Sequence, residues 1–345
     1  MTTKRARRIV KVLAGLAALG LLAACSNVGP QDYLHPEGPV AEQADSLFKP
    51  VFWIATAIFF VVEGLMVYAI FKFRERRGGS DPVQVHGNTK LEIGWTIAPA
   101  VLLAALAVPT VAMIFDQAAV PAEGEDVVRV KVIGHQWWWE YEYTDVDPPV
   151  KTANELVIPV GKKVFLEVTS ADVIHSFWVP KLGGKQDAIP GRMNSMTLIA
   201  DKPDVYHGQC AEFCALSHAN MRLRARALPQ AEYDAWLAEQ QKDAVVPTSG
   251  AAAEGARAFK EFQNGTCMAC HTIRGMEGAS GTVGPDLTHF ADRLTFAGSI
   301  FDMNEENLAK WLRDPPGVKP GSIMPNYHIP EETIAAMVAF LLSLK

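Results

Sequence analysis

The sequence has few charged residues for its length, and their sum is a small negative charge. Of the 345 residues only 20% are charged, 49% are hydrophobic, and the formal net charge is -6. A net negative charge argues against a nucleic-acid-binding protein, because nothing attracts the chain to phosphate backbones. The excess of apolar over charged residues favours a protein with membrane segments, and the length suits two or three domains.

Cysteine is also scarce, and its placement leaves no framework of structural disulfides. The five cysteines are Cys25, Cys210, Cys214, Cys267 and Cys270. Each lies in a short motif that gives it another role, so none is left over for a stabilising disulfide. A small secreted scaffold held together by cystines is therefore not expected.

The N-terminal apolar run is too short to cross a bilayer. It extends from Val12 to Ala24 and follows five basic residues, Lys4, Arg5, Arg7, Arg8 and Lys11. This pattern predicts a signal peptide over residues 1–24. The run ends in Leu-Ala-Ala-Cys25, which resembles a bacterial lipobox, in which the cysteine is diacylated and becomes the new N-terminus. The alternative is a plain signal peptide followed by a chance cysteine.

Two later apolar runs are long enough to span a membrane. Val51–Phe71 is followed at once by basic residues, which places that end in the cytoplasm, and 93–115 returns the chain outward. We therefore expect an outer segment at 25–45, a first transmembrane helix with its basic end at 46–77, and a cytoplasmic loop with the second helix at 78–116. The protein would lie in a bacterial plasma membrane, crossing it twice, with all later residues on the outer face.

Beyond residue 117 the pattern changes twice. Short runs of alternating apolar and polar residues predict an all-β sandwich within 117–228. A helix is expected over 230–242, and the small, polar stretch 246–255 predicts a linker, so that 229–255 joins two domains. The last domain, 256–345, is expected to be helical, with a closing amphipathic helix around Met337.

One loop of the β-rich domain gathers an unusual set of metal-binding side chains. It contains Cys210, Glu212, Cys214, His218 and Met221 within twelve residues, and one more histidine, His175, lies upstream. Soft sulfur ligands together with imidazole suit copper. The alternative is a Cys210–Cys214 disulfide with ordinary packing of the rest, but a disulfide would need neither His218 nor Met221 at those offsets.

A second motif lies in the last domain. Cys267-Met-Ala-Cys270-His271 is the attachment pattern of a c-type haem, although a bare match could arise by chance or bind zinc. The segments Val283–Leu287 and Gly321–Tyr327 follow it, and together the three resemble class I cytochrome c. That resemblance implies Met324 as the second axial ligand of the haem iron. Met303 is the competing sulfur, but it lies where the helix 304–313 is expected to begin.

The copper motif, with its upstream His-Ser-Phe-x-x-Pro, resembles the CuA site of the cytochrome c oxidase subunit II family. The resemblance implies two bridging thiolates, two histidines, a thioether and a backbone carbonyl as ligands of two copper ions: His175, Cys210, Glu212 (carbonyl), Cys214, His218 and Met221. It also implies that the Glu212 carboxylate reaches a magnesium ion held jointly with subunit I.

Two further segments carry the same resemblance. Gly134–Tyr143 is similar to an aromatic segment of that family whose first tryptophan receives electrons near the copper, a role that falls on Trp137; Trp138 stands where the family usually has tyrosine. The alternative is that these rings only pack. Leu91–Ala100 resembles the start of the family's second span, where Glu92 matches a glutamate near a proton-uptake path. A carboxylate at a helix N-terminus is the plainer alternative.

The fused haem motif makes the whole chain similar to subunit II of caa3-type haem-copper oxidases. That implies a multidomain fold: a two-helix transmembrane hairpin, an all-β cupredoxin-like sandwich and an all-α class I cytochrome c domain. Electrons would pass from a soluble cytochrome or a quinol-oxidising complex to haem c, then to CuA, then to haem in subunit I, where oxygen is reduced with proton pumping. The expected partners are subunit I and other oxidase subunits. A CuA-containing nitric oxide reductase subunit and a non-catalytic electron-transfer lipoprotein remain as alternatives.

Overall fold

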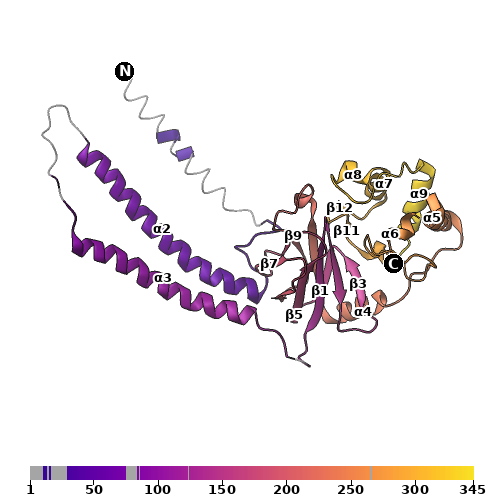
Figure 1. The fold of residues 1–345 in the computed structure, drawn as a ribbon, viewed down its shortest axis with the longest axis horizontal. Helices are drawn as coiled ribbons and strands as arrows, with labels where there is room; N and C mark the ends of the chain where they lie inside the picture. The colour runs from indigo at the N-terminus through magenta and orange to yellow at the C-terminus, as the bar shows by residue number, and fades with distance from the viewer. Residues whose placement is uncertain are drawn as a thin grey trace, which may run out of the picture.

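The computed structural model of the chain describes residues 11–13, 15–16, 29–74, 84, 86–122, 124–264 and 266–345. Cys25, most of the predicted signal peptide and most of the predicted cytoplasmic loop lie outside the described residues. The remainder forms three parts, shown in Figure 1: a pair of long helices, a β-sandwich, and a C-terminal helical domain on the side of the sandwich away from the helix pair.

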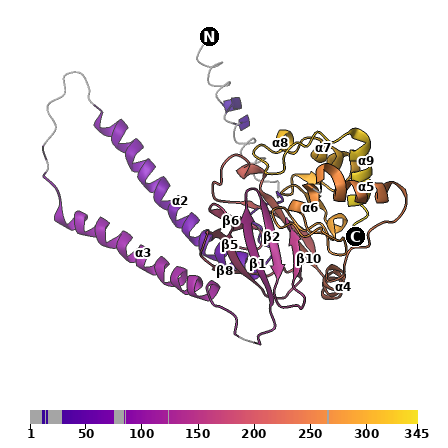
Figure 2. The same ribbon diagram turned by 45° about the vertical axis from the view of Figure 1, so that its right-hand side comes forward.

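The helix pair contains both predicted spans. Helices α2 (Pro39–Phe73) and α3 (Thr89–Gln117) have mean hydropathies of 2.2 and 2.3 over their most apolar stretches, none of which is buried. Both are long and apolar enough to cross a membrane. Their ends meet at the sandwich, where Gln43 Nε2 donates to Asp116 Oδ2 at 3.3 Å, and the helices project from there (Figures 1 and 2).

Two five-stranded sheets form the sandwich, with strand orders β3-β2-β1-β5-β8 and β4-β10-β9-β6-β7. Burial alternates along β1, so that Val128, Val130 and Val132 face the core between the sheets, as the alternating sequence pattern predicts. The strands are β1 Val128–His135, β2 Trp138–Tyr143, β3 Val150–Ala153, β4 Glu155–Pro159, β5 Val164–Ser170, β6 His175–Trp178, β7 Lys185–Ala188, β8 Asn194–Leu198, β9 Asp204–Cys210 and β10 Arg222–Leu228.

The C-terminal domain packs around the helix pair α5 and α9. Gly255 of α5 leaves room for the α9 backbone at Ala336, and Phe259 meets Phe340 edge to face at 5.7 Å. The expected closing helix is α9, with Met337 and its neighbours buried. The elements are α5 Gly250–Glu261, η2 Phe262–Asn264, α6 Thr266–Cys270, η3 Phe290–Asp292, β11 Thr295–Phe296, β12 Phe301–Asp302, α7 Glu305–Arg313, α8 Pro315–Val318 and α9 Glu331–Leu341.

The connection between the two domains is more ordered than the sequence suggests. Helix α4 (Gln230–Gln240) lies where a helix is expected and buries Tyr233. The stretch 246–255 is not wholly irregular, because α5 begins at Gly250, where a run of alanines favours helix. Residues before it are held as well: Arg274 Nη1 donates to Gln241 O at 3.0 Å, and Ala244 N–H donates to Arg274 O at 3.0 Å. The domains are therefore joined by a packed segment.

Candidate metal centres

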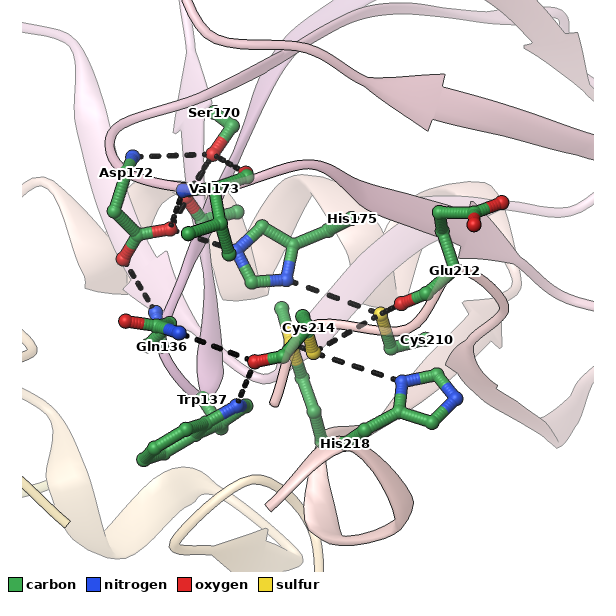
Figure 3. Close-up of polar contacts among 12 residues, drawn as sticks. Gln136, Trp137, Ser170, Asp172, Val173, His175, Cys210, Glu212, Cys214 and His218 are labelled. Carbon is green, nitrogen blue, oxygen red and sulfur yellow. Dashed lines mark hydrogen bonds and ion pairs between the residues drawn. The ribbon is translucent and has the colours of Figure 1, made fainter. Parts of the chain in front are cut away.

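The sulfur and imidazole side chains of the copper motif converge at one end of the sandwich (Figure 3). The Sγ atoms of Cys210 and Cys214 are 3.8 Å apart. His175 Nδ1 lies 3.9 Å from Cys210 Sγ, and His218 Nδ1 lies 3.6 Å from Cys214 Sγ. Each sulfur therefore has an imidazole beside it, and the two pairs share a common centre.

Strand ends and a tight loop produce this convergence. Cys210 ends β9, and its N–H donates to Met221 O at 2.8 Å, which closes the loop between β9 and β10. Within the loop, Ala215 has a left-handed backbone (φ 79°) that reverses the chain, and η1 (His218–Asn220) follows. Met221 Sδ is thereby brought to 4.0 Å from Cys214 Sγ.

The backbone carbonyl and the side-chain carboxylate of Glu212 point in opposite directions. Its carbonyl oxygen lies 3.3 Å from Cys210 Sγ, facing the sulfur pair. Its carboxylate points away from the sulfurs in Figure 3 and lies 3.7 Å from Lys185 Nζ, with 45% of the side chain exposed. Only the carbonyl can therefore join the donors of the copper motif.

Asp172 fixes the orientation of His175 and was not singled out from the sequence. Its Oδ1 lies 2.8 Å from His175 Nε2, which leaves Nδ1 facing Cys210, and Gly134 has no side chain to obstruct the ring. Burial lowers the pKa of His175, but the hydrogen bonds to Asp172 and Cys210 outweigh it and the pKa is raised. An aspartate three residues before a metal-binding histidine is the signal that could have identified it.

The two sulfurs are close enough to shift each other's pKa in opposite directions. The interaction with Cys214 lowers the pKa of Cys210, whereas the interaction with Cys210 and burial raise the pKa of Cys214. A buried negative sulfur beside a second thiol and two imidazoles is a site for a cation. Two thiolates, two imidazoles, a thioether and a carbonyl form a soft donor set that fits copper.

Three consecutive tryptophans beside the copper motif have different surroundings. The indole N–H of Trp137 donates to Cys214 O at 2.7 Å, and Gln136 Nε2 donates to the same oxygen at 3.1 Å. Trp138 stacks on His135 with ring centroids 4.2 Å apart. Trp139 is fully buried against Phe177 in the sandwich core. Of the three, only Trp137 contacts the loop 210–221, called the copper loop below, through its ring nitrogen.

The haem motif lines a largely apolar cavity in the C-terminal domain. Cys267, Cys270, His271 and Met324 all lie on its wall, whereas Met303 does not. His271 Nδ1 donates to Pro285 O at 2.8 Å, so that Nε2 is the nitrogen that could bind a metal, and a Cβ on Gly284 would collide with the ring. Burial lowers the pKa of His271, which favours the neutral imidazole. An apolar cavity with two thiols, a neutral imidazole and a thioether fits a haem c.

The far wall of this cavity belongs to the sandwich. Gln136, Trp137, Trp138 and Asn154 line it together with the haem-motif residues. Trp137 therefore contacts both candidate centres: its ring nitrogen bonds the copper loop, and its side chain borders the haem cavity. This shared wall has no sequence signature, because it arises from the packing of residues more than a hundred positions apart.

Glu92 lies at the start of α3, on the far end of the helix pair. Its Oε1 accepts a hydrogen bond from Asn88 N–H at 3.2 Å, and Asn88 Oδ1 accepts from Lys90 N–H at 3.1 Å and from Leu91 N–H. Reciprocal bonds of this kind satisfy the free N–H groups of a helix N-terminus. Glu92 thus has a capping role that is independent of any proton transfer.

Three family matches divide the chain as the fold does. Residues 32–113 match the family described as "Cytochrome C oxidase subunit II, transmembrane domain". Residues 148–228 match "Cytochrome C oxidase subunit II, periplasmic domain". Residues 252–345 match "Cytochrome c".

Similar proteins include several whole subunits. The cytochrome c oxidase subunit 2 of Alkalihalophilus pseudofirmus is 41% identical over 323 residues, covering 90% of each chain. That of Bacillus sp. (strain PS3) is 40% identical over 352 residues, covering 96% of each. Among solved structures, the periplasmic domain of subunit II of cytochrome oxidase from Bradyrhizobium japonicum is 34% identical, with a TM-score of 0.33, covering 36% of this chain and 97% of that one.

Proposed function

Because the chain belongs to the cytochrome c oxidase subunit II family and ends in a cytochrome c domain, we propose that it delivers electrons to the oxidase from its own haem. As such a subunit it is a membrane protein that works in a complex with subunit I. The proposed path leads from haem c to a dinuclear copper centre and then to haem in subunit I, where oxygen is reduced to water and protons are pumped.

Six residues would hold the copper pair in this proposal. The sulfurs of Cys210 and Cys214 would bind the copper, and the remaining ligands would be His175, His218, Met221 and the carbonyl of Glu212. When bound, such a pair shares one electron over two metals, so that its geometry changes little between oxidation states. The chain supports this with ligands fixed on strand ends and with Asp172, which prevents the His175 ring from turning.

Four residues would hold the haem. Cys267 and Cys270 would form the thioether bonds, and His271 and Met324 would be the axial ligands, a combination that gives a high reduction potential. The Pro285 carbonyl orients His271, and the apolar wall excludes water from the ring. The electron donor would be a soluble cytochrome or a quinol-oxidising complex.

Glu212 and Glu92 have further proposed roles at the contact with subunit I. The outward carboxylate of Glu212 is suited to a magnesium ion, because hard oxygen ligands favour hard cations. Glu92 would lie near a proton-uptake path on the cytoplasmic side of the membrane. The basic residues Lys72 and Arg74 at the end of α2 support a cytoplasmic location for this end of the helix pair. An unchanged rate of oxygen turnover in Glu92→Gln oxidase would eliminate the proton role and leave capping.

The observation that supports this function most directly is the position of Trp137 between the two candidate centres. The test uses the assembled oxidase, with metal analysis and transient absorption after rapid reduction of the haem. We expect two coppers and one covalent haem per chain, a purple mixed-valence absorption, and haem oxidation in step with copper reduction. Copper without electron uptake from the haem would refute the path, and turnover of nitric oxide in place of oxygen would point to the reductase alternative.

A further inference from the structure

A short segment of the C-terminal domain contacts the copper end of the sandwich through two side-chain hydrogen bonds. Residues 319–321 precede the proposed haem ligand Met324. Lys319 Nζ donates to Trp137 O at 2.5 Å, and Ser217 Oγ in the copper loop donates to Pro320 O at 2.6 Å. Gly321 lies flat against the Trp137 ring: an added Cβ would be 2.5 Å from its Cη2 atom. The loop that carries one proposed haem ligand thus bonds to the copper loop and to the tryptophan beside it.

Lys319 is buried in this contact without a partner of opposite charge. The residue is 4% exposed, and its other hydrogen bond is to Ala297 O at 2.8 Å. Within the described part of the chain no carboxylate forms an ion pair with it. Burial lowers the pKa of Lys319 to about 7. Lys319 also lines the haem cavity, so its amine lies between that cavity and the backbone of Trp137.

The amine of Lys319 packs closely against the backbone of Gly298. Gly298 has a left-handed backbone (φ 80°), and a Cβ there would lie 2.5 Å from Lys319 Nζ and 3.0 Å from Trp137 O. The Gly298 carbonyl accepts a hydrogen bond from Arg222 N–H of β10 at 2.9 Å, which fixes this turn to the sandwich. The amine therefore lies in a pocket formed by the backbones of both domains.

We propose that Lys319 is a positioning residue, which holds the backbone of Trp137 from the haem-ligand loop and so keeps the indole between the haem cavity and the copper loop. This inference rests on the proposed electron path. The rate of electron transfer depends steeply on the separation of the two centres, and Lys319 to Gly321 bond the haem-ligand loop directly to the copper end of the sandwich. Without the amine, the carbonyls of Trp137 and Ala297 are buried with no donor from Lys319, and the contact loosens.

The test compares Lys319→Met with Lys260→Met in the assembled oxidase. Methionine keeps the length of the side chain but cannot donate, whereas Lys260 is a half-exposed lysine of the same domain, 3.6 Å from Glu277. We expect haem-to-copper transfer to slow about tenfold or more in Lys319→Met and to stay at the wild-type rate in Lys260→Met. The slowed step should also depend on solvent viscosity, because the domains must find their contact again.

Two spectroscopic controls distinguish a loss of Trp137 positioning from damage to the metal centres themselves. The reduction potentials of both centres and the methionine–iron absorption band should be unchanged in Lys319→Met. A slowed rate accompanied by a shifted potential or a lost band would overturn the positioning role. A wild-type rate in Lys319→Met would also overturn it while leaving the electron path intact. Absence of haem-to-copper transfer in the wild-type oxidase would instead refute the proposed function itself.

A second variant keeps the inference testable if Lys319→Met does not assemble. Ser217→Ala removes the bond from the copper loop to Pro320 O and leaves Lys319 in place. We expect a smaller slowing, about threefold, again with unchanged potentials. An unchanged rate in Ser217→Ala would show that the 319–321 contact does not position the centres.

Discussion

The two candidate metal sites are neighbours, yet the protein builds them in opposite ways. At the copper end of the sandwich, strand ends and backbone hydrogen bonds gather the donors, and His175, Cys210 and Cys214 each place an atom within 4.8 Å of the others. Around the haem cavity, Cys267 and His271 come from one short motif, whereas Met324 comes from a distant loop on the same wide wall. The protein gathers the donors of the first site within one loop and a neighbouring strand, whereas the second site is a wide apolar cavity.

This contrast has a thermodynamic consequence. The sandwich has its own continuous core, from Val130 to Tyr233, whereas much of the C-terminal core borders the cavity. A group that binds only the folded state stabilises it, and the effect is largest where the group replaces missing core. Copper should therefore add little to the stability of the sandwich, and haem should decide whether the C-terminal domain folds.

The largest effect is expected when haem attachment is prevented. Changing Cys267 and Cys270 together to serine, which is nearly the same size, should leave the C-terminal domain without cooperative unfolding and open to proteases. The sandwich should keep its copper absorption and its unfolding temperature. Thermal unfolding and limited proteolysis of the purified full chain measure both parts at once.

A methionine that does not line the cavity supplies the control. Met303→Leu removes a sulfur from the same domain and should leave the haem in place and the domain folded. If the double serine variant retained a cooperative transition for residues 250–345, the C-terminal domain would have a self-sufficient core, and the contrast between the two sites would fail.

A smaller effect is expected at the orientation of His175. In Asp172→Asn the amide is a weaker acceptor for His175 Nε2–H, so Nδ1 is held less firmly toward Cys210. Copper affinity should fall by about ten- to a hundredfold, with the haem spectrum unchanged. A copper titration against a competing chelator measures it. Asp126→Asn, at an 89% exposed carboxylate of the same domain, is the matched control; equal losses in both variants would mean that Asp172 has no special role.

Local sequence patterns predicted much of this molecule. The apolar runs, the alternating strands and the closing helix are confirmed, because each depends on periodicity within one segment. Most of each metal-binding motif could be recognised for the same reason, since Cys210 to Met221 and Cys267 to His271 each lie within one short segment. The haem cavity wall from Gln136 and Asn154, and the buried Lys319, were not predicted, because they depend on contacts between segments far apart in the chain. The start of α5 was missed because glycine and alanine suggested a linker.

The smallest expected effect concerns the contact between the two regions. Glu155 of β4 is 2% exposed, and its Oε1 accepts hydrogen bonds from Thr295 N–H at 2.7 Å and from Thr295 Oγ1 at 3.1 Å. Burial raises the pKa of Glu155, although Thr295 and Arg293 oppose that shift. The packed state therefore binds a proton more tightly than the unfolded state. The contact should be strongest below the unfolded pKa and should weaken as the pH rises through the raised value.

Glu155→Gln should remove this pH dependence while keeping an oxygen to accept from Thr295 N–H. Unfolding of the haem domain, followed by haem absorption between about pH 5 and pH 8, measures this pH dependence. The effect of Glu155→Gln should be smaller than that of the double serine variant or of Asp172→Asn. Glu142→Gln, at a carboxylate 3.8 Å from Lys151 on the same sandwich, should leave the wild-type profile intact. Both regions contribute titratable groups to this contact. If the pH dependence were unchanged in Glu155→Gln, other groups at the contact would cause it, and Glu155 would only accept the hydrogen bonds of Thr295.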